Sequence, residues 1–172
     1  MMITAKHILG LLRQKHVRDV FVAECKDGSS WMAQHLRLDA WAMRRSWAPL
    51  TTFGYEIKVS RSDWTSDKRW SEYLPLCHRF SLVCPVGLIG AHELPADVGL
   101  VWAVGNRLHT KRAAAYRQPD SAKLCSLMAY VLMSRARIVR HMHDANVDPQ
   151  VLRERIGQLE MEVAALRLRG AA

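Results

Sequence analysis

Three residues among the first 60 have the chemical types and the spacing that hydrolysis of a phosphate ester requires. Glu56 and Lys58 stand two residues apart in the segment 54–60, where apolar and polar residues alternate. Side chains at this spacing lie on one face of a β-strand. Asp39 stands in an earlier segment of similar alternation, 35–44. If the two strands are neighbours, the two carboxylates converge at one end of a sheet.

Such a set suits a divalent cation and a phosphate. Mg²⁺ binds a few carboxylates and keeps several water molecules. A lysine ammonium beside it would orient or activate a water molecule and offset charge on the phosphate. Metal-assisted hydrolysis of a phosphodiester needs these parts. The spacing alone is not specific, because a solvated edge strand with ordinary ion pairs would show the same residues, and both interpretations stay open at this point.

The surrounding periodicity indicates the elements that position these residues. Residues 3–16 carry apolar side chains at helical spacing behind Thr4, a suitable N-cap. Residues 62–77 show a second helical pattern, with Ser62 as the expected cap. Alternating or β-branched segments predict strands over 19–26, 35–44, 54–60, 79–84 and 99–104.

The order helix, three strands, helix, strand is typical of an α/β fold with a mixed central sheet. In the second predicted strand, strict alternation would place Leu38 and Ala40 on one face of the sheet. It would place Asp39 and Trp41 on the opposite face.

The length of 172 residues suits one domain with a helical appendage. Composition shifts after Pro119, so we expect the sheet domain over 1–118 and a helical C-terminal extension over 119–172. In that extension, the apolar residues of 149–168 step by four and three, as in a heptad seam. Two interpretations stay open: a short coiled coil that forms a homodimer, or a helix that packs on its own domain.

Composition and charge narrow the class of protein. The formal net charge of +9 and a pI of about 9.8 favour a nucleic-acid partner, because Lys and Arg that neutralise phosphates release counterions. No apolar run approaches the roughly 20 residues that cross a bilayer, so no membrane partner is expected. The first residues lack the pattern of a secretory signal, and we expect a cytoplasmic protein. The four cysteines form no CxxC pair, which argues against a cysteine zinc site.

The pieces Leu38-Asp39 and Glu56-Ile57-Lys58 resemble the motif of the PD-(D/E)XK, or restriction-endonuclease-like, nuclease superfamily. In that superfamily an Asp on one strand precedes (D/E)-x-K on the next, within an αβββαβ core with a mixed sheet. Leu38 replaces the Pro that gives the motif its name.

The resemblance is closer to the MmcB-like DNA-repair proteins and to related phage and actinobacterial proteins. It rests on RLDAWAMRRSW, on ELPADVGLVW and above all on the block from Gly54 to Pro85. It covers roughly residues 18–116, and the C-terminal helices lie outside it.

The resemblance implies a deoxyribonuclease dependent on Mg²⁺ or Mn²⁺, acting in DNA repair or phage DNA processing. Asp39 and Glu56 would hold the metal, and the backbone carbonyl of Ile57 would be a further ligand. Lys58 would serve the attacking water.

Members of the superfamily often add an acid from the first helix, but residues 3–16 contain no Asp or Glu. Glu24 on the first predicted strand is the nearest substitute as a metal neighbour; otherwise it is an ordinary strand-end charge. The missing helix acid favours an alternative function, a catalytically inactive DNA-binding or assembly module on a nuclease fold.

Five further residues are candidates for contact with DNA. Ser60, Arg61 and Lys68 follow the strand of Glu56, where they would meet phosphates if this junction faces DNA. Arg44 and Arg45 stand close to a tryptophan, a combination that suits backbone contact and base stacking. The alternative interpretation of the first group is helix capping and a solvated first turn.

Overall fold

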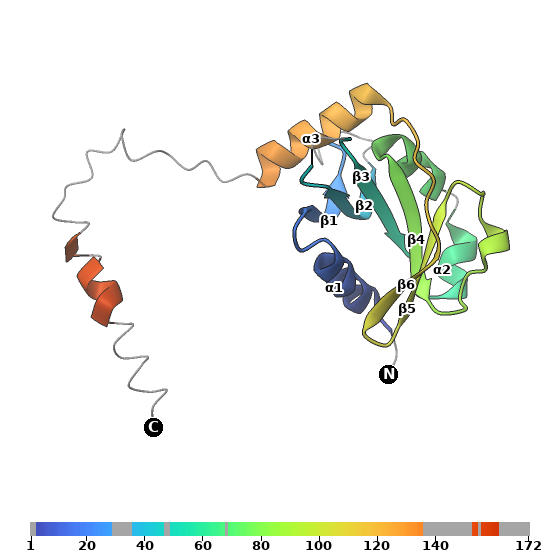
Figure 1. Cartoon of the computed structure of the whole chain (residues 1–172), viewed down its shortest axis with the longest axis horizontal. Coiled ribbons are helices and arrows are strands. Elements are labelled where there is room, and N and C mark those ends of the chain that lie inside the picture. Colours follow the sequence, from blue (N-terminus) through green and yellow to red (C-terminus); the bar gives the residue numbers. More distant parts are fainter. Residues whose placement is uncertain are drawn as a thin grey trace. The chain divides into compact units, whose positions relative to one another are not determined.

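The computed structural model describes residues 3–28, 36–46, 49–67, 69–135, 153–154 and 156–161. They form an α/β fold built on a six-stranded mixed sheet, in which the strand order β1 to β6 follows the chain (Figure 1). The elements are α1 (Ala5–Lys15), β1 (Val20–Lys26), β2 (Arg37–Met43), β3 (Thr52–Ile57), α2 (Arg61–Ser66), the 3-10 helix η1 (Trp70–Leu76), β4 (Arg79–Pro85), the 3-10 helix η2 (Ala91–Glu93), β5 (Gly99–Val104), β6 (Arg107–Arg112) and α3 (Ser121–Arg135).

The first three strands form an antiparallel meander, and β3, β4 and β5 then run parallel. The predicted order of helix, three strands, helix and strand is confirmed. Beyond the prediction, β6 returns antiparallel along β5. The turn between them contains Gly105, whose φ of +54° is a conformation that glycine adopts without steric cost.

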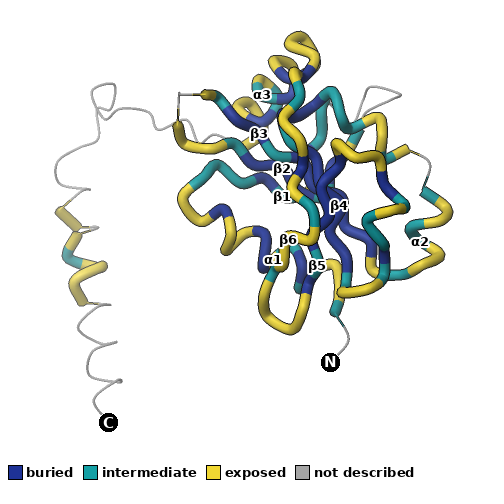
Figure 2. The backbone as a smooth tube through the Cα atoms, turned by 45° about the vertical axis from the view of Figure 1, so that its right-hand side comes forward, coloured by how far each residue is buried: buried dark blue, intermediate teal, exposed yellow. Residues whose placement is uncertain are grey.

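Each face of the sheet is covered by a different set of elements. On one face, α1 packs Ile8, Leu11 and Leu12 against sheet residues such as Tyr55 and Ile57. On the other face, η1, α3 and the segment between β4 and β5 pack on buried residues of the strands. The buried residues lie along the strands in the middle of the sheet, between its two covered faces (Figure 2). Because both faces are covered, a polar side chain on a central strand is buried whichever way it points.

The first helix agrees closely with its prediction. The Oγ1 atom of Thr4 accepts a hydrogen bond from the backbone N–H of His7 at 3.2 Å, which satisfies one donor that a helix start leaves open. The segment predicted as one helix over 62–77 is instead two elements, α2 and η1. Pro75 lies inside η1, where it removes a backbone donor and prevents a regular α-helix.

The cap of α2 is also corrected, because it is Ser60 and not Ser62. The Oγ atom of Ser60 accepts from the backbone N–H of Asp63 at 3.1 Å. The helix therefore begins at Arg61, directly after the chain leaves β3.

The predicted strict alternation in β2 is wrong. Leu38 and Trp41 belong to the same core cluster, whereas Ala40 packs in the cluster on the opposite face. The register of β1 and β2 pairs Ala23 with Ala40 and Cys25 with Leu38, and it skips Glu24 and Asp39 between these pairs. Glu24 has a φ of +50°, so the alternation changes where the chain departs from regular strand geometry.

The compact unit that contains the sheet extends over Met1–Ala136 and includes α3. Leu124, Leu127 and Val131 of α3 are buried in the same core cluster as β1 and η1. The predicted division after residue 118 therefore separates α3 from the core on which it packs.

The second unit covers Arg137–Ala172. Its described residues are helical, and Ile156, Leu159 and Met161 are exposed within it. The rest of the heptad seam at 149–168 lies outside the described residues, so the homodimer stays a prediction. Among the helices that the structure describes, none is long and apolar enough to cross a membrane.

The packing of β3 against η1 gives a first test. A Cβ atom added at Gly54 would lie 2.7 Å from the Sγ atom of Cys77 and 3.1 Å from Leu38. We expect Gly54→Ala to lower the free energy of unfolding by about 1–3 kcal/mol in chemical denaturation. Gly10→Ala is the matched control, since a Cβ there meets nothing within 4 Å. That change should stabilise α1 by about 0.5–1 kcal/mol, and equal effects of both substitutions would contradict the packing.

Candidate active site

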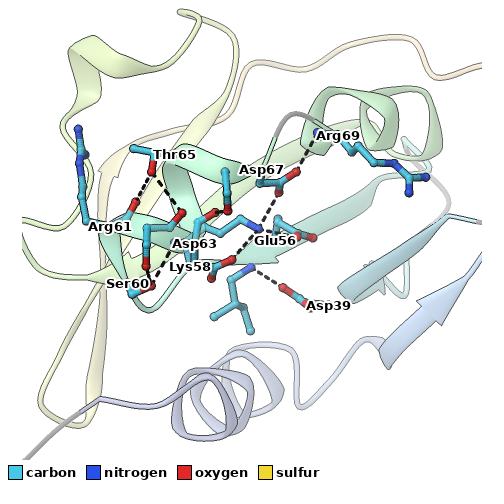
Figure 3. Close-up of polar contacts among 12 residues, drawn as sticks. Asp39, Glu56, Lys58, Ser60, Arg61, Asp63, Thr65, Asp67 and Arg69 are labelled. Atoms are coloured by element: carbon cyan, nitrogen blue, oxygen red, sulfur yellow. Dashed lines mark hydrogen bonds and ion pairs between the residues drawn. The ribbon is translucent and has the colours of Figure 1, made fainter.

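The sheet brings Asp39 and Glu56 together, as their strands are hydrogen-bonded neighbours. In the register of β2 and β3, Ala40 pairs with Tyr55, so the two acids are adjacent at the same end of the two strands. The Oδ2 atom of Asp39 accepts a hydrogen bond from the backbone N–H of Ile57 at 2.6 Å (Figure 3). The expected neighbourhood of the two strands is therefore present in the fold, and the convergence of both carboxylates on one cation stays a prediction.

Lys58 lies on the same side of β3 as Glu56, and both side chains are buried. Their exposed fractions are 5% for Lys58 and 7% for Glu56. The Lys58 N–H donates to the Val83 carbonyl at 2.9 Å, which extends the pairing of β3 with β4 beyond Ile57. The extended backbone explains why the two-residue spacing holds both side chains on one face.

The Lys58 ammonium is held by carboxylates from two elements. Its Nζ atom lies 3.1 Å from Glu56 Oε1 on β3 and 2.6 Å from Oδ2 of Asp67, which follows α2 (Figure 3). A third carboxylate, that of Asp63, lies 3.6 Å away. Sequence reasoning missed Asp67 as a partner of Lys58. The available signal was the four-residue spacing of Asp63 and Asp67, which places both acids on one side of a helix.

Burial changes the acidity of each group in this cluster. It raises the pKa of Glu56 to about 7, and the charge of Asp39 adds to this rise while Lys58 opposes it. Burial also raises the pKa of Asp39, against the hydrogen bond from Ile57. For Lys58, burial alone would lower the pKa, but the bonds to Asp67 and Glu56 outweigh it, so the pKa is raised. Lys58 is therefore an ammonium at neutral pH, among several acids.

One buried atom of this cluster has no partner. Glu56 Oε2 makes no hydrogen bond in the structure. A buried carboxylate oxygen without a partner is costly, and such atoms are rare in folded proteins. A divalent cation would satisfy it and relieve the repulsion between Glu56 and Asp39.

The donor set fits a hard cation that keeps water ligands. Within the described ranges, no three His, Cys, Asp or Glu side chains form a group that could hold a metal by themselves. Asp39, Glu56 and the carbonyl of Ile57 offer oxygen only, and Mg²⁺ commonly uses one or two carboxylates with water filling the rest of its shell. These residues therefore suit Mg²⁺ or Mn²⁺ better than a metal that needs a closed protein cage.

Glu24 lies near this site without joining its hydrogen bonds. Its charge contributes to the raised pKa of Asp39. Its carboxylate is half exposed and pairs with Arg37 at an Oε2–Nε distance of 3.2 Å. Its role as a metal neighbour stays a prediction.

The residues predicted to contact DNA next to β3 have structural partners. Ser60 caps α2. The Arg61 guanidinium pairs with Glu93, with an Nη1–Oε1 distance of 2.9 Å, and also donates to the Leu88 carbonyl. Lys68 lies outside the described residues. The helix-capping interpretation thus accounts for Ser60, and Arg61 also ties α2 to the segment between β4 and β5.

Arg44 and Arg45 are exposed, but they are not close to the carboxylates. They follow β2 at Met43, which pairs with Thr52 at the opposite end of β3 from Glu56. Five residues of extended chain separate Arg44 from Asp39, roughly 17 Å along the strand. Any DNA contact by these two arginines would lie well away from the Asp39–Glu56 site.

Comparison with known proteins adds information about the fold. No family model and no curated protein matches the chain. A solved structure does match: a protein of unknown function from Silicibacter pomeroyi, with a TM-score of 0.57 and 23% sequence identity. The match covers 84% of this chain and 93% of that chain. At this identity the likeness shows the fold alone.

The raised pKa of Glu56 predicts how stability depends on pH. The folded protein binds this proton more tightly than the unfolded chain, so stability falls as pH rises from about 4.5 through 7. Glu56→Gln removes the titration. In chelator at pH 8, we expect it to raise the free energy of unfolding by up to about 3 kcal/mol, and at pH 5 by little. Denaturation at the two pH values measures the difference.

Glu93→Gln is the matched control, because it should change the free energy of unfolding in the opposite direction to Glu56→Gln. Its hydrogen bond with Arg61 lowers the pKa of Glu93 to about 2, so this carboxylate is charged at both pH values. The control should lower stability equally at pH 5 and pH 8. A Glu56→Gln effect that is the same at both pH values would show that Glu56 is not the strained group.

Proposed function

We propose that this protein is a metal-dependent deoxyribonuclease that hydrolyses phosphodiester bonds, in DNA repair or in phage DNA processing. The observation that carries the proposal is the cluster of half-buried Asp39 with buried Glu56 and Lys58 at the shared end of β2 and β3, with an unpartnered oxygen on Glu56. A cluster that costs stability and places strongly shifted groups together is typical of functional sites.

In this proposal Asp39 and Glu56, with the Ile57 carbonyl, hold Mg²⁺ or Mn²⁺. The bound cation supplies a more acidic water and offsets charge on the phosphate. The chain's own contribution is to fix the two carboxylates. The Ile57 N–H holds one oxygen of Asp39, and the Lys58 ammonium holds one oxygen of Glu56, which leaves a second oxygen on Glu56 for the cation.

Lys58 acts as a donor and not as a base. An ammonium whose pKa is raised does not take up a proton at neutral pH. Asp67 and Glu56 orient its Nζ atom beside the carboxylates, where it donates to the attacking water or to a phosphate oxygen. Asp67 therefore positions Lys58.

A second candidate function is a DNA-binding or assembly module without catalysis. The observation that favours it is the same set of ion pairs, since Lys58 is already satisfied by Glu56 and Asp67 and α1 contributes no acid. On this reading the cluster only joins β3 to α2, and the net charge of +9 supplies DNA affinity.

Cleavage of single-stranded, duplex and branched DNA separates the two functions. Wild type should cleave with Mg²⁺ or Mn²⁺ and not with chelator. Asp39→Asn, Glu56→Gln and Lys58→Met keep the size of each side chain and should each reduce the rate about 100-fold or more. A gel shift of the same DNA in chelator should change much less than the rate, because at most one phosphate contact, that of Lys58, is lost.

Glu72→Ala is the matched control, since Glu72 is an exposed acid on η1 that pairs with Arg69. Its rate should equal that of wild type. DNA retention without cleavage by folded wild-type protein, with either metal, would reject the nuclease in favour of the binding module.

A further inference from the structure

A pocket of about 380 Å³ lies beside the proposed active site and shares a wall with it. Its lining combines two tryptophans with polar side chains: Trp64, Thr65, Asp67, Trp70, Ser71 and Glu93. Asp67 is the residue that links the two sites, because its Oδ2 atom is also the 2.6 Å partner of Lys58. A ligand bound in the pocket would therefore lie close to a ligand that contacts Lys58.

The two tryptophan rings of the pocket are held in place by packing against the core. Phe80 is fully buried in β4, and the Trp70 ring stacks on it with an interplanar angle of 14°. Trp64 lies against Trp70 with ring centroids 6.3 Å apart. The Trp64 Nε1–H also donates to Glu93 at 3.3 Å, which fixes the orientation of the outer ring. Both tryptophans are only partly buried, so ring surface stays open to the pocket.

The charges around the pocket decide which part of a nucleotide it can take. Asp67 and Glu93 are both ionised, because their hydrogen bonds lower the pKa of each. Each of these carboxylates is already paired with a cation, Asp67 with Lys58 and Glu93 with Arg61, so a phosphate in the pocket would have to compete with them for these cations. A neutral, flat nucleobase has no such penalty, and every base has a π-face that stacks on an indole ring. The pocket thus suits the base better than the phosphate.

We propose that the Trp64–Trp70 pocket binds one unpaired nucleobase of DNA next to the phosphate held at Lys58. This proposal rests on the proposed nuclease function and names its substrate class, DNA with an unpaired nucleotide. A paired base is unavailable to the pocket, since its faces are covered by its neighbours in the stack.

Binding in chelator tests the pocket without any cleavage. Three labelled DNAs are compared by fluorescence anisotropy: a perfect duplex, the same duplex with one unpaired nucleotide, and that DNA with the unpaired base removed to leave an abasic site. Wild type should bind the unpaired base about 5- to 150-fold more tightly than the abasic DNA, which corresponds to about 1–3 kcal/mol.

Variants of Trp64 test whether stacking on its ring causes the preference for the unpaired base. Trp64→Leu should lose the preference for the base, and Trp64→Phe should keep most of it. Trp102→Leu is the matched control on β5, outside the pocket, and should keep all of it. Equal binding of base and abasic DNA by wild type, or a preference that survives in folded Trp64→Leu, would overturn the proposal.

Cleavage assays on the same DNAs keep this inference separate from the nuclease. Metal-dependent cleavage that ignores the unpaired base would uphold the nuclease and reject the pocket. A base preference in chelator without cleavage of any DNA would uphold the pocket and reject the nuclease. Absence of DNA binding by folded wild type would reject both.

Discussion

The burial of Glu56 and Lys58 on one face of β3 is the constraint on which the rest of the site depends. Removing a carboxylate and an ammonium from water costs several kcal/mol for each unless partners replace the water. Glu56 alone does not satisfy Lys58, and Asp67 supplies the second carboxylate. That contact requires the chain to turn into a helix directly after β3, which the Ser60 cap achieves. The Lys58–Asp67 pair thus helps to fix α2, and with it the tryptophan pocket, together with the Arg61–Glu93 pair and the packing of Trp64 on the core.

The same cluster leaves one oxygen of Glu56 without a partner. Asp39 lies beside Glu56 at the place where the pairing of β1 with β2 is interrupted, and Glu24 has a positive φ there. A fold selected only for stability would avoid a buried acid beside a half-buried one, an unpartnered oxygen and a glutamate with positive φ at one place. Their coincidence is what a cation-binding site predicts, because a cation removes the repulsion and satisfies the oxygen. Several departures from ordinary structural rules at one place are typical of a functional site.

Much of this arrangement could be predicted from the sequence. The two-residue spacing of Glu56 and Lys58 gave their common face, and periodicity gave α1 and the order of the elements. The break in β2 could not be predicted, because it coincides with an interruption of its pairing with β1 at Glu24, whose positive φ is uncommon for a residue other than glycine. The pairing of Lys58 with Asp67 was also not predicted, since it requires knowing where α2 begins and that Pro75 belongs to a separate 3-10 helix. Tertiary contacts determine both the break in β2 and this pairing.

The central claim is that Asp39 and Glu56 hold a divalent cation. Anomalous diffraction from crystals of the full chain soaked in Mn²⁺ tests it most directly, with Glu56→Gln crystals as the reference. The account predicts an anomalous peak contacted by both carboxylates and by the Ile57 carbonyl, and no such peak in the variant. If wild-type crystals at saturating Mn²⁺ show no peak there, and Asp39 and Glu56 keep only their bonds to Ile57 and Lys58, the cluster is a structural ion-pair network and the claim is contradicted.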